Sequence, residues 1–154
     1  METREEIQGA VEKAKRLMLD CGIDTDVTTD DLIQWFETEI PIPDISLGDV
    51  ILDPLLVVHE LVEIDEILKM GLELTKDVII KNPRKVDDAH LKAATVEVKI
   101  ANSIGSVEHL RERVKDMEKW CVEETLPESR RIEYRHLMLD TKSILSDLER
   151  KRRH

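Results

Sequence analysis

Two glutamates in an otherwise apolar stretch are the first residues whose types and spacing suggest chemistry. Glu60 and Glu63 lie between Asp53 and Gly71, where most side chains are Leu, Val and Ile. Their spacing of three residues places both carboxylates on one face of a helix. Carboxylates on a largely apolar stripe are costly unless each gains a partner. That partner is a divalent cation or, in the alternative interpretation, water or a basic side chain.

A third glutamate, Glu97, also lies on an apolar stripe, where its carboxylate is costly without a partner. Its neighbours on that stripe are Ala93, Ile100, Ala101 and Ile104. Carboxylates that converge between two helices repel one another, and each resists ionising without a cation. Oxygen ligands with room for water suit Mg²⁺ or Mn²⁺. We therefore predict a Mg²⁺ or Mn²⁺ site, with salt bridges to lysine or arginine as the alternative. The predicted ligands are Glu60, Glu63 and Glu97.

Asp87 and His90 are second choices as metal ligands. His90 lies seven residues before Glu97, so in a helix it points to the same side two turns away. Asp87 and its neighbour Asp88 also suit a helix N-terminus, where they would cap the helix and face the positive end of its dipole. For His90, and for His59 beside Glu60, the alternative is a partly exposed histidine with one hydrogen bond.

A separate motif, Glu133-x-x-His136, has the spacing used by di-iron carboxylate bundles. Such a site needs two units of this kind and two further glutamates, and the sequence holds one unit. A di-metal carboxylate bundle is therefore only a weak functional hypothesis. The sequence contains no P-loop, nucleophile elbow, GxGxxG or HExxH motif.

The charge of the chain argues against two classes of partner. The net charge is −11, from 34 acidic and 23 basic residues. General binding to nucleic acid or to an anionic membrane needs a basic surface, so we expect neither partner. The basic tail from Glu149 to His154 is the exception. It suits contact with a phosphate, but cationic side chains also simply stabilise a helix C-terminus.

The cysteines and the N-terminus favour a cytoplasmic protein. Cys21 and Cys121 lie far apart in the sequence, without the spacing of a zinc site. Reduced, buried thiols are the state expected in the cytoplasm. The first residues are charged and are not followed by a signal peptide, and no apolar run is long enough to span a membrane.

The periodicity of apolar residues predicts an all-α protein, an antiparallel bundle of five or six helices. We expect one domain over residues 1–154, with a core at about 30–125 and the terminal helices packing on it or on a second subunit. Thr29 is the expected N-cap of the second helix, and Asp87 that of a long helix weakened at residues 102–106. Residues 41–48 are expected to be an irregular connector that packs on the body and forms the rim of a cleft. The expected helices span residues 3–21, 29–40, 53–71, 72–81, 87–125 and 129–151.

The segment Glu60-Leu-Val-Glu63, followed by a connector and another acid-bearing helix, resembles the all-α nucleoside triphosphate pyrophosphatase superfamily. This group includes MazG-like proteins, dimeric dUTPases and phosphoribosyl-ATP pyrophosphohydrolases. Its signature is an ExxE on one helix and an ExxD on the next, which bind Mg²⁺ together. The resemblance covers roughly residues 30–110. The chain departs from the signature, because Ile100 stands where Glu97 would need an aspartate, and His90 follows Asp87 at the same spacing.

The resemblance implies a divergent Mg²⁺-dependent enzyme that splits a nucleoside triphosphate into a monophosphate and pyrophosphate. Its metal would be held by Glu60, Glu63 and Glu97, either with Asp87 and His90 completing the shell or in a degenerate site that no longer turns over. The resemblance also implies a homodimer or homotetramer. Basic residues available for the phosphates are Lys69, Lys76, Lys81, Arg84, Lys85 and Lys99.

The competing hypothesis is a non-enzymatic helical protein that works by oligomerisation or interaction. Its apolar stripes would be buried against a second copy or another partner, and its acidic residues would be solvated or paired with basic side chains.

Overall fold

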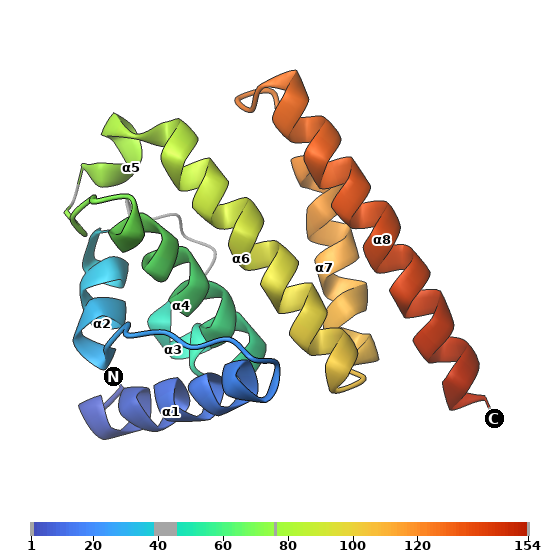
Figure 1. Ribbon diagram of the computed structural model, residues 1–154, viewed down its shortest axis with the longest axis horizontal. Helices are drawn as coiled ribbons and strands as arrows, with labels where there is room; N and C mark the ends of the chain where they lie inside the picture. The colour runs from blue at the N-terminus through green and yellow to red at the C-terminus, as the bar shows by residue number, and fades with distance from the viewer. Residues whose placement is uncertain (1, 39–45, 76, 154) are drawn as a thin grey trace. The chain divides into compact units, whose positions relative to one another are not determined.

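The structure, a computed structural model, describes residues 2–38, 46–75 and 77–153, and within these residues the protein is all-helical (Figure 1). This confirms the predicted fold class. Eight helices occur in the described residues, more than the five or six predicted, because a short helix at Leu47–Val50 was not expected and the long helix expected at residues 87–125 is divided into two. The helices are α1 (Arg4–Asp20), α2 (Thr29–Thr38), α3 (Leu47–Val50), α4 (Pro54–Lys69), α5 (Val78–Lys81), α6 (Pro83–Ser103), α7 (Val107–Trp120) and α8 (Glu128–Arg152).

The chain forms two compact units, Met1–Glu97 and Val98–His154. The boundary falls inside α6, so most of this helix belongs to the first unit and its last turns to the second. The single domain expected over residues 1–154 stays a prediction.

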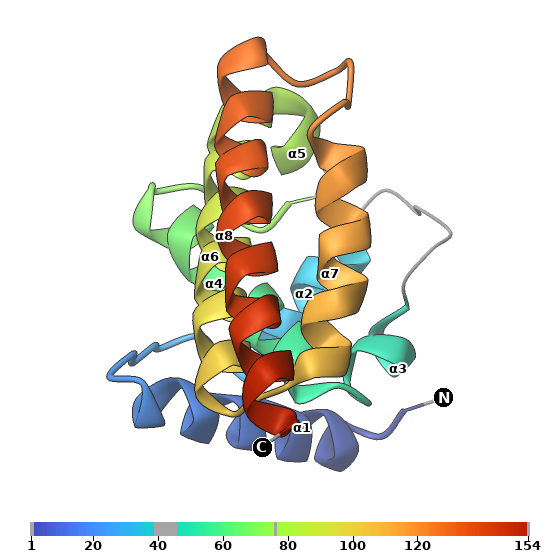
Figure 2. The same cartoon turned by 90° about the vertical axis from the view of Figure 1, so that its right-hand side faces the viewer.

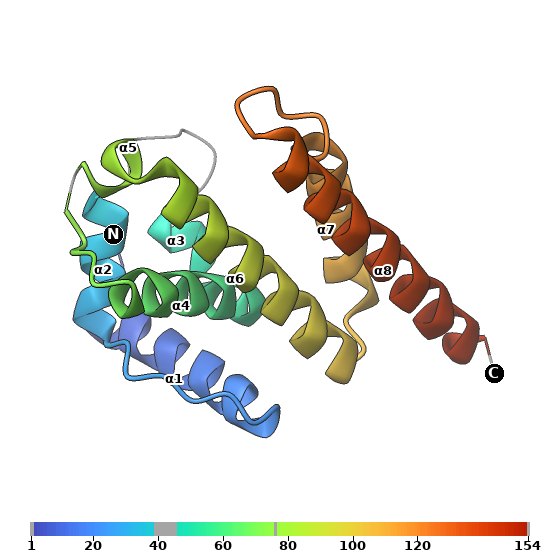
Figure 3. The ribbon, with the colours of Figure 1, turned by 45° about the horizontal axis from the view of Figure 1, so that its top comes forward.

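Helix α4 is the centre of the first unit, where it contacts α1, α2 and α3 (Figure 3). Nine of its 16 residues are buried, which is why its sequence is apolar on most sides. Helix α1, the N-terminal helix, lies against α4. The buried residues of α4 are Leu55, Val57, Val58, His59, Leu61, Val62, Glu63, Ile64 and Ile67.

Local rules explain both ends of α4. The Asp53 side chain accepts a hydrogen bond from the backbone N–H of Leu55 at 2.9 Å, and Pro54 takes the first helical position. At the other end Gly71 adopts a φ of 81°, a conformation that favours glycine. The N–H groups of Gly71 and Leu72 then bond the carbonyls of Leu68 and Ile67, which forms a Schellman motif.

Several predicted helix boundaries are wrong, among them the start of the helix expected at residues 72–81, which begins at Val78 as α5. Helix α6 begins at Pro83 instead of being capped by Asp87, since proline suits the first turn of a helix. Helix α2 is capped by Thr28 and not by Thr29: the Thr28 hydroxyl accepts from the N–H of Asp31, while the Asp31 carboxylate accepts from the N–H of Thr28.

A further error concerns the connector expected at residues 41–48. Leu47 belongs to helix α3, which a reciprocal capping box between Ser46 and Asp49 starts. The rest of that connector, residues 41–45, and Ile40 of the second predicted helix lie outside the described residues. The predicted weak point at residues 102–106 is confirmed, because Gly105 separates α6 from α7 with a φ of 68°.

In the second unit α7 and α8 form a helical hairpin (Figure 2). The Trp120 and Tyr134 rings pack at 5.2 Å between centroids, and the Arg113 guanidinium lies 5.6 Å from the centroid of the Trp120 ring. In the described part of the chain, every helix is too short or too polar to cross a bilayer.

Candidate functional site

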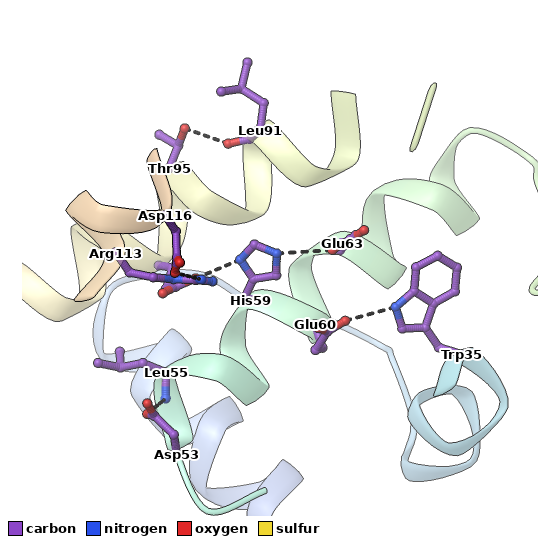
Figure 4. A network of polar contacts seen from close by, with 11 residues as sticks. Trp35, Asp53, Leu55, His59, Glu60, Glu63, Leu91, Thr95, Arg113 and Asp116 are labelled. Atoms are coloured by element: carbon purple, nitrogen blue, oxygen red, sulfur yellow. Dashed lines mark hydrogen bonds and ion pairs between the residues drawn. The ribbon is translucent and has the colours of Figure 1, made fainter. Parts of the chain in front are cut away.

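The feature most able to do chemistry is a buried histidine between two buried glutamates, His59, Glu63 and Glu97, here called the His59 cluster (Figure 4). Nε2 of His59 lies 3.2 Å from Oε2 of Glu63, one turn along α4. Nδ1 of His59 lies 2.7 Å from Oε1 of Glu97 on α6. The three side chains are 6%, 9% and 1% exposed. The imidazole of His59 thus links α4 to α6.

The contacts of His59 favour a charged imidazole. An imidazole nitrogen donates to a carboxylate only when it carries a proton, and both nitrogens of His59 face carboxylate oxygens. Burial by itself lowers the pKa of His59, because it disfavours the charged ring. Hydrogen bonds to Glu63 and Glu97, together with their negative charges, outweigh burial and raise the pKa to about 10. His59 is therefore an imidazolium at neutral pH.

His90, a second-choice metal ligand, lies beside the cluster. Its ring is 5.0 Å from the His59 ring between centroids, in an edge-on arrangement at 65°. The helical spacing of His90 and Glu97 therefore brings both residues of α6 to the same histidine of α4. The alternative expectation for His59, a partly exposed ring with one hydrogen bond, is wrong, because His59 is buried and contacts two carboxylates.

Glu60, the other predicted ligand on α4, is directed to a different partner. Its Oε2 atom accepts a hydrogen bond at 2.9 Å from Nε1 of Trp35, a fully buried residue of α2 (Figure 4). The structure thus brings Glu63 and Glu97 to His59, while Glu60 joins α4 to α2. Of the second choices, Asp87 lies 3.5 Å from the Arg84 guanidinium in an ion pair.

The arrangement of these residues does not fit a metal ion. Among residues 2–38, 46–75 and 77–153, no group of three His, Cys, Asp or Glu side chains is arranged to hold one. The His59 ring stands between Glu63 and Glu97 and engages one carboxylate with each nitrogen. The cation beside Glu63 and Glu97 is therefore the His59 side chain. The Mg²⁺ or Mn²⁺ site of Glu60, Glu63 and Glu97 stays a prediction.

Several basic residues considered for phosphate contacts are engaged in ion pairs. Lys69 bonds Asp65, and Lys81 bonds Asp77, each at 2.6 Å. Arg84 pairs with Asp87, as described above. Lys85 and Lys99 are exposed, and Lys76 lies outside the described residues.

The Glu133 and His136 pair also falls outside any buried cluster. Both side chains are exposed on α8, and Glu133 lies 3.5 Å from Nε of Arg130. Nothing in this geometry supports a di-metal carboxylate site.

Sequence reasoning missed the central role of His59. One signal was available, because His59 and Glu63 are four residues apart on an apolar helix and so face each other along one side. The contact with Glu97, 38 residues further along the chain, had no comparable signal.

No family model, curated protein or solved structure matches this chain. The fold and the cluster together define an all-α protein with an internal ion cluster. The resemblance to the all-α pyrophosphatases stays a prediction.

Proposed function

We propose that this chain is a non-enzymatic helical interaction protein in which the His59 cluster is a structural ion cluster. One observation carries the proposal: both ring nitrogens of His59 lie within hydrogen-bond distance of carboxylate oxygens. The two most buried acids of the predicted site thus share one positive charge supplied by the protein. A buried charge that is hydrogen-bonded in this way supports packing specificity between helices.

The partner we propose is a second copy of the chain, docked through the outer face of α8. Only three of the 25 residues of α8 are buried, against nine of 16 in α4. Ile132 and Leu139 are 41% and 54% exposed, and their spacing of seven places them on one helical face.

The charges at the two ends of this face suit self-association. Glu128 and Arg150 each lie eleven residues from Leu139, about three helical turns in opposite directions. An antiparallel pair of α8 helices centred on Leu139 would therefore set Glu128 of one copy opposite Arg150 of the other, as a two-fold axis requires. A cytoplasmic location is part of the proposal. It is supported by Cys21 and Cys121, which do not form a disulfide with each other.

Light scattering after size-exclusion chromatography tests the interaction directly. The native chain should elute as a dimer or tetramer, and Leu139→Asp should give a monomer with unchanged helical circular dichroism. Leu52→Asp, at a residue 82% exposed in the other unit, is the matched control and should leave the oligomer intact. A native monomer, or an oligomer that Leu139→Asp leaves unchanged, would contradict self-association through α8.

The second candidate, a Mg²⁺-dependent nucleoside triphosphate pyrophosphohydrolase, keeps one supporting observation. Two of the three predicted ligands, Glu63 and Glu97, come from different helices and lie on either side of one histidine ring. Pyrophosphate release should be screened over the common nucleotides with Mg²⁺ or Mn²⁺. Melting with and without each ion should be compared for the native chain and Glu60→Gln. Release lost in Glu60→Gln would favour the enzyme, and a flat screen without a metal shift would favour the interaction protein.

A further inference from the structure

We propose that the turn between α6 and α7 is a hinge, which opens so that two copies of the chain exchange their α7–α8 hairpins. The turn spans residues 104–106 and lies inside the second compact unit, which also holds the last turns of α6 (Figure 2). When the turn opens, α6 and α7 become one continuous helix. The inference goes beyond the association through α8, because it involves another part of this unit and does not depend on that association.

The first reason is an apolar stripe that runs through the turn without losing its helical phase. Its members are three or four residues apart on both sides of the turn, as on one face of a single helix. Ile104, in the turn itself, is 51% exposed, whereas the other members are buried. In a continuous helix Ile104 would return to the stripe and be covered by the second copy. The members of the stripe are Val96, Ile100, Ile104, Val107, Leu110, Val114 and Met117.

The second reason is that the turn depends on the conformation of one glycine. Gly105 has a φ of 68°, and the N–H of Ser106 bonds the carbonyl of Ala101 at 2.9 Å, as in a Schellman motif. Within residues 77–153, the Ser106 side chain caps no N–H group of α7. Helical backbone at Gly105 would replace the turn by the hydrogen bonds of a longer helix.

Two other connections between helices are fixed in ways that the turn after α6 is not. The start of α2 has the reciprocal capping contacts of Thr28 and Asp31, which set where that helix begins. Helix α8 follows Pro127, which cannot donate the hydrogen bond that would continue a helix from before it. The sequence has no proline between Pro83 and Pro127, so none blocks a helix through residues 104–106.

A second copy of the chain is the partner that fits the open form. The stripe of the continuous helix needs a cover, and the same stripe of another copy supplies one. With a two-fold axis near Gly105, an antiparallel pair of these helices sets α7 of one copy beside the end of α6 of the other. Each α7–α8 hairpin stays intact, including the ion pair of Arg111 with Glu149 at 3.6 Å. Contacts inside one chain are thus replaced by the same contacts between two chains.

Gly105→Ala tests the hinge, with Gly22→Ala as the matched control. Both glycines follow a helix at a positive φ, 68° and 75°, and an added Cβ would have open space at either. Alanine is strained at such a φ but suits a helix, so Gly105→Ala should raise the dimerisation constant about tenfold or more. Gly22→Ala should leave it unchanged. Both variants are made in the Leu139→Asp chain, which removes association through α8, and are measured by light scattering after size-exclusion chromatography.

A further variant tests whether the dimer contains the continuous helix. Glu108→Pro places a proline in the first turn of α7, where it is tolerated, but it would break a helix that runs through the turn. Added to Gly105→Ala, it should restore a monomer with the helical circular dichroism of the native chain. A dimer that persists with Glu108→Pro, or equal dimerisation of the two alanine variants, would overturn the inference. The difference between the alanine variants decides the hinge, whereas the effect of Leu139→Asp alone decides the association through α8.

Discussion

The Nδ1 atom of His59 lies 2.7 Å from the Oε1 atom of Glu97, although 38 residues separate them along the chain. The side chains of Glu97 and His59 are 1% and 6% exposed, so this contact joins α4 to α6 where little water reaches. A charge-assisted hydrogen bond at such a place is stronger than one on the surface. Much of the resistance of the first unit to unfolding should depend on it.

Glu97→Gln should therefore destabilise the protein while keeping the shape of the side chain. The amide cannot carry the negative charge that balances His59, and hydrogen bonds to charged groups contribute about 1.5 to 3 kcal/mol. We expect a loss of about 2 kcal/mol in the free energy of unfolding, measured by urea denaturation. Glu12→Gln, an exposed change on α1, should cost under about 0.5 kcal/mol. Equal losses in the two variants would contradict the role of Glu97.

The stability contributed by His59 should fall as the pH rises. Its pKa is raised from 6.5 to about 10 in the folded protein, so between these values the folded state holds a proton that the unfolded state has released. The contribution is fully present below about pH 6.5 and is lost as the pH rises through about 10. Urea denaturation of the native chain and His59→Gln should give a stability difference that shrinks steadily over this window. A difference that stays constant or grows would contradict the assignment.

Trp35→Phe should weaken the junction between α2 and α4. Trp35 is fully buried and donates a hydrogen bond to Glu60 at 2.9 Å, so phenylalanine leaves both a cavity and an acceptor without this donor. We expect a loss of about 2 kcal/mol. A double-mutant cycle with Glu60→Gln should reveal a coupling of about 0.5 to 1.5 kcal/mol. Strictly additive effects would show that the bond contributes nothing to stability.

Two glycines should respond to alanine with opposite signs. Gly9 is exposed inside α1, with nothing within 4 Å of an added Cβ, so Gly9→Ala should stabilise the chain by about 0.5 to 1 kcal/mol. Gly71 has a φ of 81° at the end of α4, so Gly71→Ala should cost about 1 kcal/mol. The melting temperatures of the two variants, compared with that of the native chain, test both predictions. A loss for Gly9→Ala or a gain for Gly71→Ala would contradict the helix geometry.

Sequence patterns predicted the elements whose ends obey local rules. Helix α4 was predicted within two residues at each end, because Asp53 and Gly71 are residues that begin and end helices. The start of α6 was mistaken because Asn82-Pro83 has two interpretations. Proline stops the helix before it, but it equally suits the first turn of the helix after it.

In the candidate site, too, local sequence rules predicted only part of the arrangement. That Glu63 and Glu97 need a partner followed from their apolar surroundings, and both are buried. The identity of that partner depends on how α4 and α6 are rotated against each other, which local spacing does not determine. Glu60 was grouped with Glu63 for their spacing, whereas the structure directs Glu60 to Trp35 of α2.

The position of α4 in the chain has a consequence for how the protein is made. Helices α1, α2 and α3 all precede α4 in sequence, and each packs against it. During vectorial synthesis these three segments leave the ribosome before the helix that covers their apolar sides. The first unit therefore cannot complete its packing until α4 has emerged. A pause before α4 has left the ribosome would leave the amphipathic α1 exposed to chaperones, whereas a pause after α4 has emerged would not.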